Sequence, residues 1–205
     1  MLRIFSGLYK GRKLRSVKHP DVRPTTARVK LAFFDAMQAE VRQAVFLDGF
    51  AGVGNIGIEA LSRGARYVVF IEELRECVKA LRHNLEKIGV PPDCYRIING
   101  DYNRSVIQLA KDGFQFDLVF LDPPYGLLEY ADPVKVAAKR GLLAPGGRVI
   151  LERPALIDFT SRWLERVHSQ KVGNRRLDYY ARAALSEDGS SPSEDGSRPD
   201  SSKMD

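Results

Sequence analysis

The tetrapeptide Asp122-Pro123-Pro124-Tyr125 follows an apolar run, residues 116–121, that is typical of a buried strand. Two successive prolines cannot continue a central strand, because neither has the N–H group that the hydrogen-bond ladder needs. The chain must therefore leave the sheet in a stiff turn. Since ligands of open α/β sheets bind at the carboxyl ends of the strands, this turn displays a carboxylate, fixed carbonyls and an aromatic ring at a ligand-binding edge.

Such a turn suits the chemistry of an exocyclic amine on a nucleobase. The lone pair of this amine is delocalised into the ring, so the amine becomes nucleophilic only when its N–H groups are held and its lone pair is aimed. Asp122 can accept one N–H and the Pro123 carbonyl the other, while Tyr125 can stack on the base. The alternative is that the prolines only end a strand and that Tyr125 is a surface aromatic.

A second group of candidate ligand residues surrounds a glycine-rich loop. A short apolar strand ends at Asp48, and Gly52, Gly54 and Gly57 then satisfy the G-x-G-x-x-G spacing before an expected helix. The next strand ends at Glu72, where an acid suits a ribose diol. This nucleotide-binding pattern leaves two cofactors open. A dinucleotide would place its pyrophosphate on the helix N-terminus, whereas S-adenosylmethionine would lay its methionine part along the loop near Asp48.

Asp101 follows a third strand and could accept a hydrogen bond from an adenine amino group. It could equally be the N-cap of a helix over residues 105–111. Asp48 and Glu72 also have a simpler reading, as loop carboxylates at the starts of helices. The sequence therefore predicts three acidic strand ends besides Asp122 without deciding between ligand binding and capping.

Strands and helices alternate along the chain, which is the order of an α/β fold with a largely parallel sheet. Strands are expected at 44–47, 67–71, 95–98, 116–121, 148–152 and twice more before Leu185. Helices are expected after Thr25 or Thr26, from the glycine loop to Arg63, at 75–88, 105–111 and 130–140, and near Ile157, with a turn at 143–147. Expected core positions are Val29, Phe33, Ala36, Met37 and Val41 in the first helix and Trp163, Val167, Tyr179 and Tyr180 near the end.

The basic residues are concentrated near the N-terminus. Residues 1–30 carry nine Lys and Arg against Asp21 alone, a net charge of +8, within a protein of net charge +6. Residues 3–14 alternate apolar residues with glycines at turn positions, which predicts a β-hairpin. Aromatic and basic residues on its surface suit nucleic-acid binding, although a solvated basic face is the simpler alternative. The candidate nucleic-acid-binding residues are Arg3, Lys10, Arg12, Lys13, Arg15 and Arg23.

Length and composition narrow the class further. The 205 residues are enough for one domain with a sizeable core. No apolar run is long enough for a membrane span and no signal peptide is recognisable, so a cytoplasmic monomer is expected. Cys77 and Cys94 have neither CxxC spacing nor a nearby histidine, so buried thiols are expected rather than a zinc site or a disulfide framework.

The chain divides into three expected parts. Residues 1–42 form the basic N-terminal extension and residues 43–185 the catalytic domain. Residues 186–205 are a Ser- and Gly-rich acidic tail of net charge −4, with too few apolar residues to offset the entropy of ordering, so disorder is expected.

In combination these motifs resemble the bacterial 16S ribosomal RNA (guanine-N2)-methyltransferase (RsmD-like) family, within the class I S-adenosylmethionine-dependent methyltransferases. The resemblance covers nearly all of residues 1–185, in order. The matching segments are Arg3-Ile4, Gly11-Arg12-Lys13-Leu14, Arg23-Pro24-Thr25-Thr26, Asp48-x-Phe50-Ala51-Gly52-x-Gly54-x-x-Gly57-x-Glu59-Ala60, Ser62-Arg63-Gly64-Ala65, Asn84 and Asp122-Pro123-Pro124-Tyr125. The last segment alone is also similar to amino-methyltransferases that act on DNA adenine.

The resemblance implies a Rossmann-like α/β fold, with a mixed seven-stranded sheet, helices on both faces and an N-terminal β-hairpin that docks RNA. It implies S-adenosyl-L-methionine as cofactor and no metal. The implied cofactor-binding residues are Asp48, Phe50, Ala51, Gly52, Gly54, Glu72, Asp101 and Tyr102, and the implied catalytic residues are Asp122, Pro123 and Tyr125. The chain departs from the family pattern at Val53, where a Ser or Thr is usual, at Ala27, which is often acidic, and in its acidic tail.

We therefore expect methyl transfer from S-adenosylmethionine to a guanine N2 amine in small-subunit ribosomal RNA, free or in an assembling subunit. Three alternatives share part of the pattern. A DNA adenine-N6 methyltransferase would share both motifs, and a nicotinamide-dependent oxidoreductase would share only the glycine loop. A non-catalytic RNA-binding protein would need the basic extension but not two ligand-type strand ends.

Overall fold

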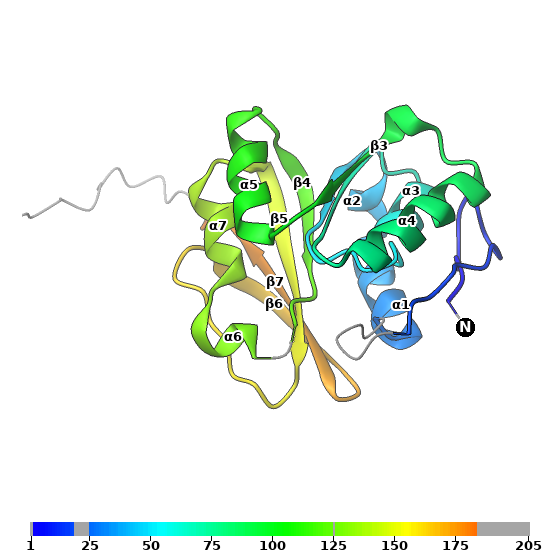
Figure 1. The fold of residues 1–205 in the computed structure, drawn as a ribbon. Coiled ribbons are helices and arrows are strands. Elements are labelled where there is room, and N and C mark those ends of the chain that lie inside the picture. Colours follow the sequence, from blue (N-terminus) through cyan, green and yellow to red (C-terminus); the bar gives the residue numbers. More distant parts are fainter. Residues whose placement is uncertain (1, 19–24, 125, 184–205) are drawn as a thin grey trace, which may run out of the picture.

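The computed structural model describes residues 2–18, 25–124 and 126–183, which form a seven-stranded sheet with helices on both faces (Figure 1). The strands are β1 (Val45–Asp48), β2 (Tyr67–Glu72), β3 (Tyr95–Asn99), β4 (Phe116–Leu121), β5 (Leu143–Pro154), β6 (Glu165–Val172) and β7 (Arg175–Ala181). The helices are α1 (Ala27–Ala36), α2 (Gln38–Val41), α3 (Gly57–Ser62), α4 (Arg75–Ile88), α5 (Tyr102–Lys111), α6 (Leu127–Tyr130) and α7 (Pro133–Lys139), with a 3-10 turn at Pro92–Cys94. The predicted mixed α/β fold is confirmed.

The strand order is β3-β2-β1-β4-β5-β7-β6. All pairs among β1 to β5 are parallel, whereas β7 is antiparallel to both β5 and β6. The order reverses between β1 and β4, which is the position where open α/β sheets bind ligands. Because β7 runs against β5, its first residue, Arg175, pairs with Pro154 and lies at the edge where the parallel strands end.

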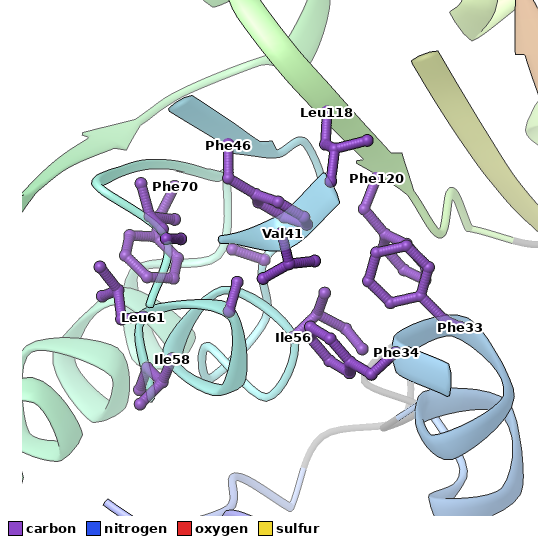
Figure 2. Close-up of a cluster of buried hydrophobic side chains, with 14 of the residues drawn as sticks. Phe33, Phe34, Val41, Phe46, Ile56, Ile58, Leu61, Phe70, Leu118 and Phe120 are labelled. Atoms are coloured by element: carbon purple, nitrogen blue, oxygen red, sulfur yellow. The ribbon is translucent and has the colours of Figure 1, made fainter. Parts of the chain in front are cut away.

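The central strands are buried on both faces, and successive side chains alternate between two apolar cores. One core contains Phe46, Phe70 and Phe120 from the sheet together with α1, α3 and α4. Figure 2 shows this cluster, in which Phe33 of α1 lies against Phe120 with the ring centroids 4.9 Å apart. The other core holds the neighbouring residues of the same strands and is covered by α5 and α7. The double burial explains why these strands are continuous apolar runs in the sequence.

The long helix forms as its sequence predicts, whereas the first expected helix is divided at Met37 into α1 and α2, so Val41 lies in α2. The Thr26 hydroxyl caps α1 by accepting a hydrogen bond from the Val29 N–H at 3.3 Å. The bounds of α4 are those predicted, and Gly89 ends it in the left-handed conformation with a φ of 81°. In α1, however, Ala36 is exposed while Lys30 and Phe34 are buried, so the predicted apolar face was partly wrong.

The N-terminal segment, residues 2–18, is a hairpin-like loop rather than a regular two-stranded ribbon. It contains one isolated antiparallel bridge, between Arg3 and Lys13. Backbone hydrogen bonds link its two arms, from the Ile4 N–H to the Arg12 carbonyl at 2.9 Å and from the Leu14 N–H to the Leu2 carbonyl at 3.0 Å. Other main-chain donors bond outside the segment: Phe5 and Ser6 donate to the Glu59 carboxylate at 2.8 and 2.9 Å, and Arg15 donates to Asn84 at 2.7 Å. These outside contacts hold the loop on α3 and α4.

Two predictions for the C-terminal part were wrong. Residues 143–147 belong to β5, where an irregularity in its pairing with β4 accommodates the expected turn. Residues near Ile157 form a turn, not a helix, because the chain there only connects β5 to β6. The predicted core positions were also partly wrong: Trp163, in the connection before β6, and Val167, on the edge strand β6, are 39% and 49% exposed, whereas Tyr179 and Tyr180 on β7 are buried as predicted.

Two further expectations concerned the two cysteines and the absence of a membrane-spanning helix. Cys77 is buried as a free thiol, as predicted, but Cys94 is only partly buried because it lies in the exposed turn before β3. Over the ranges that the structure describes, none of the helices has the length and apolarity to cross a membrane.

Candidate active site

A cavity of about 740 Å³ opens at the carboxyl edge of the sheet. It is lined by residues that follow β1, β2, β3 and β4, by Glu152 near the end of β5 and by Arg175 at the start of β7. The two motifs singled out in the sequence meet here, because β1 and β4 are neighbours in the sheet. The strand order therefore brings Asp48, Glu72, Asp101 and Asp122 to one cavity.

Glu72 fixes the glycine-rich loop. Its carboxylate accepts hydrogen bonds from the Gly52 N–H and the Leu74 N–H, both at 2.7 Å. The side chain is only partly buried and lines the cavity, so lone pairs remain for a ligand hydroxyl. This arrangement combines both predicted roles of an acid at the end of β2, since Glu72 orders the loop and faces the ligand space.

Asp48 is buried beneath the same loop. It is 2% exposed, and its carboxylate accepts a hydrogen bond from the Gly57 N–H at 2.8 Å. Burial raises the pKa of Asp48 to about 7; the bond from Gly57 opposes this shift and the charge of Glu72 adds to it. Asp48 therefore ties β1 to the start of α3 while lining the cavity floor.

The glycines of the loop have different functions. Gly52 lines the cavity, but Gly54 is not among the lining residues. A Cβ on Gly54 would lie 2.4 Å from Leu81 of α4, and a Cβ on Gly57 would lie 2.2 Å from the Phe70 ring. Gly54 and Gly57 are therefore needed for close packing of α3 against its neighbours, and Gly52 is the one placed to approach a ligand.

An aromatic pair forms another wall. Phe50 and Tyr102 stack with their ring centroids 4.9 Å apart, and the buried Tyr102 hydroxyl donates to the Pro133 carbonyl at 3.1 Å. Asp101 caps α5 by accepting from the Arg104 N–H at 2.9 Å, and it also lines the cavity, as does Ala51. Asp101 is therefore the helix cap that the sequence allowed, and its position in the cavity lining is also compatible with a ligand contact.

Asp122 and the adjacent Pro123 line the part of the cavity that follows β4. One carboxylate oxygen accepts from the Thr25 hydroxyl at 3.1 Å, and the other accepts from the Arg175 guanidinium at 2.9 Å. The Arg175 Nε in turn donates to Glu152 at 2.8 Å. Asp122 is thus held from two segments remote in sequence. Tyr125, predicted to stack on the base, lies outside the described residues.

Burial raises the pKa of Asp122 well above its usual value, and the nearby Glu152 carboxylate raises it further, whereas Arg175 and Thr25 oppose the shift. Burial likewise raises the pKa of Glu152. Perturbed acids in a cavity are a common feature of active sites.

The sequence analysis missed Thr25, Glu152 and Arg175 as site residues. Glu152 ends the strand predicted at 148–152, so the rule that located Asp122 could have located it too. Arg175 gave no such signal, because it reaches the edge only through the reversed direction of β7. Thr25 was considered only as a helix cap.

The predicted RNA-binding residues Arg3, Lys10, Arg12, Lys13 and Arg15 are all exposed on the N-terminal segment, and Arg23 lies outside the described residues. Leu2, Ser16 and Val17 of the same segment line the cavity. Both ends of the basic loop therefore reach the cavity.

The charge of the lining separates the two cofactors that the glycine loop left open. Among the described lining residues are seven acids, Asp48, Glu72, Glu73, Asp101, Asp122, Asp132 and Glu152, and one base, Arg175. Burial raises the pKa values of Asp48, Asp122 and Glu152, but the four other acids still outnumber the one base. Such a lining disfavours a pyrophosphate and favours the sulfonium and ammonium groups of S-adenosylmethionine. The cavity is also large enough for a nucleoside-containing ligand. The residues present fit S-adenosylmethionine.

Comparisons with curated proteins agree with this site. The chain is 32% identical over 151 residues to the "Ribosomal RNA small subunit methyltransferase D" of Haemophilus influenzae, covering 74% of this chain and 78% of that protein. It is 35% identical over 153 residues to the protein of the same name from Escherichia coli, covering 74% of each. These relatives are named for the activity that the sequence motifs imply.

Solved structures show the same fold over most of the chain. A putative methyltransferase from Escherichia coli has a TM-score of 0.73 and 30% identity, with 88% of this chain and 97% of that chain covered. A hypothetical protein from Thermus thermophilus has a TM-score of 0.75 and 26% identity, with 87% and 98% covered. The family described as "Conserved hypothetical protein 95" matches residues 2–181, and the chain belongs to this family.

Proposed function

We propose that the protein transfers a methyl group from S-adenosylmethionine to the exocyclic N2 amine of a guanine in small-subunit ribosomal RNA. The observation that carries the proposal is Asp122, a carboxylate that Thr25 and Arg175 hold at a cavity whose opposite side fits the cofactor. Family membership and the names of the curated relatives support the RNA substrate. The same proposal has the enzyme act in the cytoplasm, as a monomer, on free RNA or an assembling small subunit.

Each side of the cavity contributes to the reaction. When bound, S-adenosylmethionine supplies an electrophilic methyl group on a positively charged sulfur. Glu72 would hold the ribose, the pair Phe50 and Tyr102 would flank the adenine side, and Asp48 with Gly52 would lie along the methionine part. Since the electrophile needs no further activation, the chain mainly orients the reactants.

The part of the cavity that would hold the methyl-accepting base is here called the acceptor side. There, Asp122 and the Pro123 carbonyl would each accept a hydrogen bond from one N–H of the target amine. This fixes the plane of the amine and directs its lone pair toward the cofactor. The amine nitrogen becomes positive as it is methylated, and the Asp122 carboxylate would stabilise that charge at short range. Tyr125 would stack on the extruded base.

The basic N-terminal loop would bind the RNA backbone. Arg12, Lys13 and Arg15 are exposed, and the loop is anchored to the catalytic core through Glu59 and Asn84. Contacts of this kind position a nucleic acid without reading its sequence. The choice of nucleotide would then depend on the base-holding side of the cavity.

Transfer of labelled methyl from S-adenosylmethionine tests the proposal. The acceptors are small-subunit ribosomal RNA, free and in partly assembled particles, with duplex DNA in parallel, and the labelled nucleoside is identified by chromatography. N2-methylguanosine from RNA is the expected product. N6-methyladenine from DNA would keep the cofactor and the Asp122 loop but contradict the RNA substrate.

A further inference from the structure

Asp122, Glu152 and Arg175 form a buried bridge between three neighbouring strands. The Arg175 guanidinium donates to Asp122 at 2.9 Å and to Glu152 at 2.8 Å. The side chains of Asp122, Glu152 and Arg175 are 15%, 2% and 11% exposed. Since β5 lies between β4 and β7, the three side chains meet at one edge of the sheet. Within this described trio, two carboxylates face one guanidinium in a largely dry site, so the three groups carry one excess negative charge when both acids are ionised.

Glu152 has a second, unsatisfied oxygen. Its Oε1 accepts from Arg175, but its Oε2 is buried and no described residue donates to it. A buried oxygen without a donor is costly. A proton on Asp122 would allow a hydrogen bond between the two carboxyl groups, and this interaction contributes to the raised pKa of Asp122. One proton would thus neutralise the excess charge and satisfy the buried oxygen together.

We propose that Glu152 is a positioning and proton-sharing residue for methyl transfer: it holds Arg175 against Asp122, and the two carboxyl groups share one proton. The inference rests on the proposed function and adds to it how the acceptor side is organised. Among the described residues, the other groups that hydrogen-bond to the pair include the Arg175 guanidinium from β7 and the Thr25 hydroxyl before α1. The acids Asp48, Glu72, Asp101 and Asp132 line the same cavity.

The shared proton lets Asp122 act as acceptor. With the proton on Glu152, Asp122 is ionised and accepts an N–H of the target amine. The amine nitrogen then forms a bond to the methyl carbon, while the carbon–sulfur bond breaks and its electron pair goes to sulfur. The N–H bond breaks, its electron pair stays on nitrogen and its proton goes to Asp122. Loss of one proton from the pair to water restores the starting state.

The test is a carboxyl titration of the cofactor-free protein by ¹³C NMR. In the unmodified protein, Asp122 and Glu152 are expected to titrate in linked steps, because each carboxyl senses the proton on the other. In Glu152→Gln, which keeps the shape and an acceptor for Arg175, two causes of the raised Asp122 pKa disappear while Arg175 remains. The Asp122 midpoint is therefore expected to fall by about one pH unit or more.

Kinetics separate this role from a merely structural one. Glu152→Gln is expected to lower kcat about tenfold, with the KM for S-adenosylmethionine within about twofold and cofactor binding by calorimetry unchanged. Glu152→Asp, which retains a carboxyl group, is expected to recover part of the loss. Glu40→Gln is the matched control, since Glu40 is an exposed acid paired with Arg148 at 3.6 Å, and its kcat is expected to be unchanged.

The outcomes are distinguishable. Independent titration of Asp122 and Glu152 near the usual carboxyl range, or an Asp122 midpoint that does not move in Glu152→Gln, would overturn the inference. If Glu152→Gln does not fold, the linked titration of the unmodified protein still decides. If the unmodified protein neither binds S-adenosylmethionine nor methylates RNA, the proposed function fails, while the titration still judges the proton pair.

Discussion

The two sides of the cavity are built in different ways. Most of the proposed cofactor side comes from one continuous segment, in which Asp48, the glycine loop and Glu72 lie within 25 residues, and Asp101 and Tyr102 complete it. The acceptor side is assembled from Thr25, Asp122, Glu152 and Arg175, which span 151 residues. Local turns and close packing shape the first side, and tertiary contacts between buried charged groups shape the second.

This difference implies different responses to mutation. A change on the cofactor side disturbs packing beneath the loop, so it should appear first in stability. A change on the acceptor side removes a charge or hydrogen bond from the groups proposed to hold the target amine, so it should lower turnover whether or not it also lowers stability. The four predictions below test this division, in order of decreasing expected effect.

Asp122→Ala should lower turnover by at least about 100-fold, because the amine loses its charged acceptor. S-adenosylmethionine binding, measured by calorimetry, should stay within about twofold, since Asp122 is not on the cofactor side. Asp112→Ala is the matched control: this acid pairs with Arg96 on the surface. Near-normal turnover in Asp122→Ala would remove the catalytic assignment.

Gly57→Ala should destabilise the fold by about 1–3 kcal/mol, because the new Cβ would lie 2.2 Å from the Phe70 ring. A lower thermal midpoint measured by circular dichroism would show the effect. The control is Gly100→Ala, where the new Cβ meets only the Ser105 hydroxyl at 3.5 Å. Equal midpoints for the two variants would contradict the packing function given to Gly57.

Asp48→Asn should make the cofactor-free protein more stable at pH 8 than the unmodified protein, by about 2 kcal/mol. The pKa of Asp48 in the folded protein is about 7, above its usual 3.8, so its stabilising contribution is complete below about pH 4 and is lost as the pH rises through 7. Asparagine mimics the protonated side chain at every pH. Urea unfolding at pH 4 and pH 8 checks this, and an equal difference at both pH values would exclude it.

Reversing the charge of Arg12, Lys13 and Arg15 to Glu should weaken RNA binding by about tenfold in moderate salt and flatten its salt dependence. Cofactor binding and the thermal midpoint should not change, because these side chains are exposed. Filter binding over a salt series provides the measurement. Reversal of Arg75, Lys79 and Arg82 in α4 is a comparison of equal charge, and an identical loss there would mean that the loop has no special place in docking.

The sequence was sufficient wherever structure is decided locally. The bounds of α4, the cap at Thr26 and the strand ends at Asp48, Glu72 and Asp122 followed from periodicity and turn chemistry. The sequence was insufficient for polar side chains whose hydrogen-bond or ion-pair partner is distant in the sequence. The buried pair of Lys30 and Glu59, 2.7 Å apart, and the bridge through Arg175 have no periodic signature.

The N-terminal segment shows the same limit. Alternating apolar residues predicted the pairing of its two arms, which the bridge between Arg3 and Lys13 bears out. They did not predict that the main-chain donors of Phe5 and Ser6 are satisfied by Glu59 in α3. That carboxylate also pairs with Lys30 and Arg63. In the sequence, Glu59 is recognisable only as part of a family motif. In the structure, its carboxylate links the N-terminal segment, α1 and the end of α3.

The position of β7 between β5 and β6 has a consequence for how the protein matures on the ribosome. Chains fold from their N-terminal part as they are synthesised. The strands that carry the cofactor side, β1 to β4, are mutual neighbours and can pair before β7 has been made. Arg175 is its first residue, so the base-holding geometry is completed only when nearly the whole described chain has been translated. In a nascent chain, the strands of the proposed cofactor side can therefore pair before the bridge from Asp122 to Arg175 can form.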